Sequence, residues 1–194
     1  MDRREAYERR VWRLAWLLTG GREDLCVRLV AECLDAQPDL RRLDPAHLDR
    51  LVVLAARRRA RPAPEPEPGA TPARRLLAAV AALPPQPREA WVFARVDGLE
   101  PMEMARAMDC SKTAALRHLE RSDTELGGRF GDTLPSMLDA LRAEADTAAP
   151  GRALAAFRAE RRRRRRIRAA LIAFAVAAVA LAAGLVWVSA LTWW

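Results

Sequence analysis

The side chains best suited to chemistry gather in residues 98–121, where donors for nucleic acid recur at helical spacing. The sequence predicts a short helix over residues 101–108, a tight turn at residues 109–110, and a longer helix that begins after an N-cap at Ser111. Two helices joined in this way are typical of a helix-turn-helix, whose second helix lies in the DNA major groove. These residues therefore predict a DNA-binding element.

The second helix has two different faces on a helical wheel. Four residues form the face that we expect to pack inward: Ala115, Leu119, Ser122 and Leu126. The opposite face places short residues at its start and long cationic donors behind them, as contacts with base edges and phosphates require. We expect Arg117 to bind a guanine edge or a phosphate, and Arg121 a phosphate. The candidate DNA-binding residues are Lys112, Thr113, Ala114, Arg117, His118 and Arg121.

The charge balance of this region leaves a second interpretation open. Residues 76–130 contain seven lysines and arginines against eight acids, and Glu120 and Glu125 flank the cationic face. A solvated face on an ordinary helical hairpin has the same charge pattern. Because the region lacks a broad basic surface, we expect DNA binding by this element alone to be weak.

Catalytic and metal-binding patterns are missing from the sequence. The three cysteines form no CxxC pair and their number is odd, which argues against a disulfide framework and a zinc ribbon. His47 has no histidine or cysteine three or four residues away to act as a second metal ligand. There is no phosphate-binding loop and no Gly-x-Ser-x-Gly motif. We therefore expect no enzyme activity, no cofactor and no metal.

A membrane-spanning segment is predicted at the end of the sequence. Residues 169–194 are uncharged, and as a helix they would reach about 39 Å, more than the ~30 Å of a bilayer core. Seven arginines precede the segment and tryptophans end it, as at the two borders of a span. We predict a transmembrane helix over 169–191 behind a basic run at 161–168, with the N-terminus in the cytoplasm and no folded domain beyond. The flanking arginines are Arg161, Arg162, Arg163, Arg164, Arg165, Arg166 and Arg168.

Two other interpretations of this end of the chain stay open. The basic run is alternatively a nucleic-acid patch, and the apolar segment a buried core helix. Seven of the 33 lysines and arginines lie in 161–168 and all 25 acids precede them, so residues 1–160 are nearly neutral. The positive charge of the chain is thus concentrated beside the predicted span, where it suits anionic lipid.

The remaining sequence predicts an all-α fold in two small helical domains. No segment alternates with a period of two, whereas apolar residues recur at helical spacing throughout. Three helices are expected in the first domain, the first ended by Gly20–Gly21 and the third opened by Asp44–Pro45; a helix opened by Pro87 is expected in the second. The predicted units are a helical domain over 1–60, a proline-rich linker over 61–72, a helix-turn-helix domain over 73–130 and a helical connector over 131–160.

Several short motifs of the second domain resemble a known family. In order, they are Leu83-Pro84, Arg88-Glu89-Ala90, Asp97-Gly98-Leu99, Met104-Ala105 and Met108-Asp109-Cys110-Ser111. Over about 45 residues they resemble region four of extracytoplasmic-function sigma factors of the sigma-70 family. The resemblance implies that the helix after Ser111 recognises the minus-thirty-five promoter element. At residues 113–118 the sequence departs from the family's Gly-Thr-Val-Lys-Ser-Arg, with Leu116 in place of a lysine.

The first domain is similar to sigma region two only at its beginning. Residues 9–15 and 18–20 resemble the opening of that region, but no Phe, Trp or Tyr occurs between Leu17 and Ala90. Aromatic side chains bind unstacked bases well, so the first domain has few of the residues that promoter melting requires. The resemblance implies promoter DNA and RNA polymerase core as partners, beside membrane lipid.

The expected function is that of a membrane-tethered, sigma-factor-like transcription protein at the cytoplasmic face of the bacterial inner membrane. The alternative is a degenerate, membrane-anchored interaction module or regulator of another sigma factor that does not recognise DNA. Arg117 and Arg121 favour the first, whereas the weak region-two similarity and the nearly neutral body favour the second. A regulatory protein or a second copy, paired through the span, are further partners left open.

Overall fold

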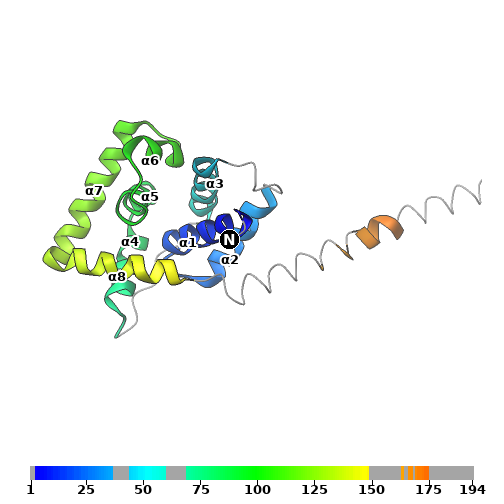
Figure 1. Ribbon diagram of the computed structural model, residues 1–194, viewed down its shortest axis with the longest axis horizontal. Helices are drawn as coiled ribbons and strands as arrows, with labels where there is room; N and C mark the ends of the chain where they lie inside the picture. Colours follow the sequence, from blue (N-terminus) through cyan, green and yellow to red (C-terminus); the bar gives the residue numbers. More distant parts are fainter. Residues whose placement is uncertain are drawn as a thin grey trace, which may run out of the picture. The chain divides into compact units, whose positions relative to one another are not determined.

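Helices are the regular secondary structure of the residues that the computed structural model describes, which are 3–36, 44–59, 69–148, 163, 166–167 and 169–174. Within these residues there is no strand, which confirms the all-α prediction. The helices, shown in Figure 1, are α1 (Arg3–Leu18), α2 (Glu23–Ala36), α3 (Pro45–Arg58), α4 (Pro72–Ala82), α5 (Pro85–Trp91), α6 (Pro101–Met108), α7 (Lys112–Phe130) and α8 (Leu134–Thr147).

The end of α1 is fixed by two glycines and by its close approach to α4. Gly20 and Gly21 have φ values of +69° and +76°, a region in which glycine is unstrained. A β-carbon on Gly20 would lie 2.8 Å from the Cβ of Ala81 in α4. The predicted stop at Gly20–Gly21 is therefore confirmed, and it also allows the two helices to pack closely.

The helix that carries Trp91 begins earlier than predicted. The sequence predicted a helix opened by Pro87, whereas α5 begins at Pro85 after an extended Pro84. Proline needs no helical N–H partner in the first turn, so that turn accommodates both Pro85 and Pro87. The helix continues as a π-helical turn over Val92–Val96, which no sequence pattern indicated, and ends at Asp97.

Residues 1–151 form one compact unit. In it α3 packs against α6, α5 against α7, and α8 against α4, neighbours that can be followed in Figure 1. The predicted connector over 131–160 includes α8, which buries Met137, Leu141 and Ala145 and so belongs to the packed unit. Most of the predicted linker, residues 61–68, lies outside the described residues, and the division into two domains stays a prediction.

The C-terminal unit, residues 152–194, is described at a few positions only. Residues 169–174 are helical, and Arg163 and Arg166 are exposed. No helix among the described residues is long and apolar enough to cross a membrane. Most of the predicted span over 169–191 lies outside these residues, as do Arg161, Arg162, Arg164, Arg165 and Arg168.

Candidate nucleic-acid interface

The turn between α6 and α7 has the geometry of a helix-turn-helix. Asp109 adopts a left-handed conformation with φ +57°, and the N–H of Cys110 donates to the carbonyl of Ala105 at 3.0 Å. These features end α6 within two residues, as a left-handed C-cap does. The Oγ of Ser111 then accepts the N–H of Ala114 at 3.2 Å and starts α7. The predicted bounds of α6, the predicted start of α7 and the predicted N-cap are confirmed.

The inner face of α7 packs as the wheel predicted. Ala115, Ser122 and Leu126 are buried, and Leu119 is half-buried. The hydroxyl of Ser122 donates to carbonyls of its own helix, so its burial leaves no unpaired donor. Because α5 packs against this face, the opposite face of α7 is turned to solvent.

The structure leaves most of the predicted DNA-binding residues free on the outer face. Lys112, Thr113, Arg117 and Arg121 are exposed, whereas Ala114 and His118 are half-buried at its border. Within the described part of the chain, no hydrogen bond or ion pair holds Lys112, Arg117 or Arg121. Their donors are therefore available to an external acceptor without loss of an internal contact.

His118 is uncharged at neutral pH. Burial lowers its pKa from the ordinary value of about 6.5, and repulsion from Arg121 and then Arg57 lowers the pKa further. A neutral imidazole has one donor nitrogen and one acceptor nitrogen. At the border of the outer face, His118 can thus form a hydrogen bond in either direction but adds no charge.

The sequence-based selection missed Leu116. Its side chain is 40% exposed, although apolar residues of a packed helix are expected to face inward. Leu116 lies three residues after Thr113 and four before Glu120, both of which are exposed, so its spacing placed it beside them on the outer side of the helix. The helical spacing of Leu116 indicated that its side chain is exposed, but an apolar residue was not expected there.

One acidic residue of α7 is neutralised by a neighbouring helix. Arg95, in the turn after α5, donates to Asp123 from Nε at 3.1 Å and from Nη2 at 2.5 Å. The pair is bidentate, the geometry in which arginine and a carboxylate bind most strongly. Glu120 and Glu125 are also exposed on α7. The outer face therefore presents its cations beside some uncompensated acid, which limits non-specific attraction to phosphate.

Helix α3 contacts the turn between α6 and α7. Arg57 donates to Glu89 of α5 at 2.8 and 2.5 Å and to the carbonyl of Met108 at 3.1 Å. Arg50, two turns earlier, donates to Asp109 in the turn itself at 2.7 Å. Helix α3 therefore contributes to the position of α6 and, through the turn, to the start of α7.

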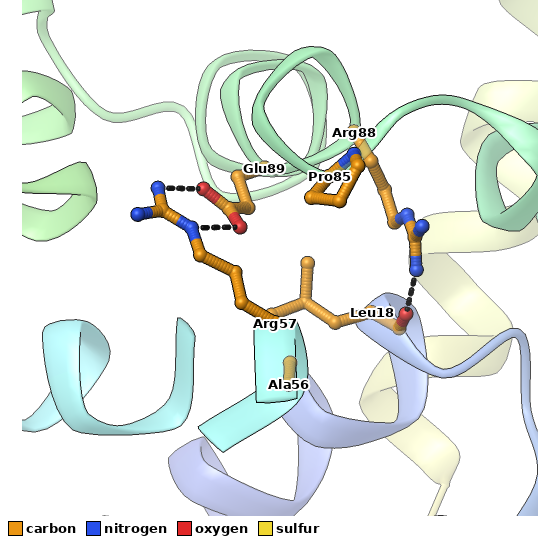
Figure 2. A pocket seen from close by; sticks show the side chains of 6 residues that line it. All are labelled: Leu18, Ala56, Arg57, Pro85, Arg88 and Glu89. Atoms are coloured by element: carbon orange, nitrogen blue, oxygen red, sulfur yellow. Dashed lines mark hydrogen bonds and ion pairs between the residues drawn. The ribbon is translucent and has the colours of Figure 1, made fainter. Parts of the chain in front are cut away.

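The contact around Glu89 is largely closed to solvent. Glu89 is 3% exposed in its side chain, and Figure 2 shows it in direct contact with Arg57 at one side of a small cavity. On the other side of the cavity Arg88 donates to the carbonyls of Leu18 at 2.8 Å and Leu83 at 3.0 Å. The cavity measures about 10 Å³, no more than one water requires, so this contact is a structural joint between α1, α3 and α5 and not a ligand site.

Two of the cysteines, Cys26 and Cys33, are buried. Burial raises the pKa of Cys26 to about 11 and that of Cys33 to about 12, so both thiols stay protonated at neutral pH. No group of three His, Cys, Asp or Glu residues able to hold a metal occurs in this part of the chain.

Comparison of the chain with protein-family models, with curated proteins and with solved structures gave no match. The function proposed below is therefore supported by the sequence motifs and by the geometry of α6 and α7.

Proposed function

We propose that the chain is a membrane-tethered, sigma-factor-like transcription protein that binds promoter DNA through α6 and α7. The observation that supports this most is the outer face of α7, on which Lys112, Arg117 and Arg121 are exposed and have no hydrogen-bond or ion-pair partner in the described residues. In a helix-turn-helix the second helix enters the major groove with its N-terminal residues against the base edges. Thr113 and Arg117, in the first two turns of α7, occupy those positions.

The charges of this face suit a specific but weak interaction. Each cation that neutralises a phosphate contributes about −1 to the slope of log affinity against log salt, so the few exposed cations of this face correspond to a shallow slope. An arginine bound bidentately to guanine contributes about 1–3 kcal/mol of discrimination. With Glu120 and Glu125 nearby, sequence-selective contacts matter more here than general attraction to DNA.

RNA polymerase core is the proposed protein partner, and the membrane the proposed location. The resemblance of α1 to the opening of sigma region two supports the first. The exposed Arg163 and Arg166 and the charge-free sequence of 169–194 support a tether at the cytoplasmic face of the bacterial inner membrane. A tether confines the search for DNA to the membrane surface, where a high local concentration offsets weak affinity.

Selection from a random duplex library tests the proposal. The full-length chain, in detergent micelles and with or without polymerase core, is expected to enrich one sequence motif, and its affinity for that motif is expected to fall with salt. Arg117→Ala is expected to relax the preference at one base pair, and Arg121→Ala to weaken binding uniformly and reduce the salt slope by about 1.

The matched control is Arg129→Ala, an exposed arginine in the last turn of the same helix that stacks on Phe130. We expect it to bind as the unsubstituted chain does. Failure of the full-length chain to enrich any sequence under both conditions would contradict DNA recognition. The interaction module without DNA recognition would then be the better description.

A further inference from the structure

One leucine of α7 is exposed, although the leucines of a packed helix usually face inward. Leu116 is 40% exposed, whereas Leu126, on the inner face of the same helix, is 1% exposed. Covering an apolar side chain that is exposed to water is favourable, because it lowers the free energy of the system. Its neighbours at helical spacing, Thr113 and Glu120, are also exposed, so the surface around Leu116 is part of the outer face.

We infer that Leu116 and Arg117 determine the sequence of the DNA site, Leu116 by contact with the methyl group of a thymine and Arg117 by contact with an adjacent guanine. This inference rests on the proposed function. It goes beyond it by naming the two bases that the outer face distinguishes and the side chain that recognises each of them.

The chemistry of the major groove leads to the thymine. Among the four bases, thymine alone presents a methyl group on this edge, whereas hydrogen-bond donors or acceptors dominate the edges of the other three. A leucine placed against a donor or acceptor would leave that group dehydrated and unpaired, which is unfavourable. Covering the thymine methyl has no such penalty and removes apolar surface of both partners from water.

The chemistry of arginine leads to the guanine. A guanidinium presents two parallel N–H donors, which match O6 and N7 of guanine. In the described residues Arg117 has no hydrogen bond or ion pair to give up for this contact, whereas Arg95 is committed to Asp123. Consecutive residues of a helix rise by about 1.5 Å and lie about 100° apart around its axis, so Leu116 and Arg117 occupy neighbouring sectors of the exposed side, and we assign them to the same or neighbouring base pairs.

The cations near the two ends of this surface complete the arrangement. Lys112 precedes the pair by four residues and Arg121 follows Arg117 by four, and both are exposed. We assign these two side chains to phosphates, since contacts with the DNA backbone fix the register but are insensitive to sequence. The discrimination between bases then depends on positions 116 and 117.

Single-atom changes in the DNA test the inference. The selected duplex is prepared with each thymine replaced in turn by deoxyuridine, which lacks the methyl, and each guanine by 7-deazaguanine, which lacks N7. The full-length chain is expected to bind about fourfold more weakly when one particular thymine is replaced, and about tenfold more weakly when a neighbouring guanine is replaced.

Variants of Leu116 and Arg117 show which side chain causes each loss of affinity. Leu116→Ala is expected to bind the thymine and deoxyuridine duplexes equally, and Leu116→Met to keep the difference. Arg117→Ala is expected to be insensitive to 7-deazaguanine, and Arg129→Ala to behave as the unsubstituted chain. If each replacement of a thymine by deoxyuridine changes the affinity of the unsubstituted chain and of Leu116→Ala equally, this inference is overturned and the proposed function stands. If no duplex is selected, the proposed function falls and this inference falls with it.

Discussion

Replacement of Arg57 by methionine tests whether α3 holds the helix-turn-helix in position. The substitution keeps an apolar stem but removes the bidentate contact with Glu89 and the donor to the carbonyl of Met108. Glu89 is 3% exposed, so its carboxylate would lose its cation and stay buried. Removing one partner of a buried ion pair costs about 3–5 kcal/mol. Because Arg57 itself is 26% exposed, we expect the lower end, about 3 kcal/mol.

The loss of stability caused by Arg57→Met is expected to depend on pH, and the burial of Glu89 determines whether it grows or shrinks as pH rises. Burial raises the pKa of Glu89 above the ordinary glutamate value, while Arg57 acts to lower it. A carboxyl group with a raised pKa holds its proton more tightly in the folded state, so folding loses stability as pH rises above the ordinary value. Without Arg57 the pKa rises further, and the loss continues to higher pH. The substitution is therefore expected to cost little at low pH, where Glu89 is protonated, and most at high pH.

Urea unfolding of the full-length chain, followed by helical circular dichroism at about pH 5 and about pH 8, measures both effects. The control is Arg50→Met, on the same helix, whose pair with Asp109 is 44% and 49% exposed and should contribute less than about 1 kcal/mol. If Arg57→Met destabilises the chain too strongly, Arg57→Met with Glu89→Leu is expected to recover part of the loss. Equal costs for Arg57→Met and Arg50→Met, or a cost that does not fall at low pH, would refute the reasoning.

Three further predictions concern the backbone and the thiols. Gly20→Ala is expected to destabilise the chain by about 1–3 kcal/mol more than Gly98→Ala in urea unfolding, because both have positive φ but only at Gly20 would the new carbon lie 2.8 Å from α4. Ser111→Ala should cost about 1 kcal/mol through loss of the α7 N-cap, and Ser111→Asp should keep it; equal melting of both variants would be inconsistent with the cap. In mass-spectrometric alkylation near neutral pH, half-buried Cys110 should react before buried Cys33, whose pKa burial raises to about 12, and the opposite order would contradict the packing.

Local signals in the sequence predicted the parts of the fold that local forces determine. Ser111 starts α7 because its hydroxyl accepts a nearby N–H, and Gly20–Gly21 ends α1 because glycine tolerates positive φ. Residue type and spacing report such features directly. The boundaries of α6 and the inner face of α7 were predictable for the same reason.

Other features depend on residues far apart in the sequence. Arg57 and Glu89 are separated by 32 positions, and no periodicity indicates that they meet. The start of α5 at Pro85, the π-helical turn at Val92–Val96 and the packing of α8 on α4 likewise depend on tertiary contacts. Leu116 was missed because residue type outweighed spacing, although it is the spacing that places a side chain on a helix face.

The central claim is that the outer face of α7 binds the major groove, and methylation interference measures it most directly. In a selected duplex treated with dimethyl sulfate, methyl groups on guanine N7 lie in the major groove and those on adenine N3 lie in the minor groove. We predict that N7 methylation of at least one guanine prevents binding of the full-length chain, that N3 methylation does not, and that Arg117→Ala removes the difference. Interference at N3 with none at N7 would contradict the account.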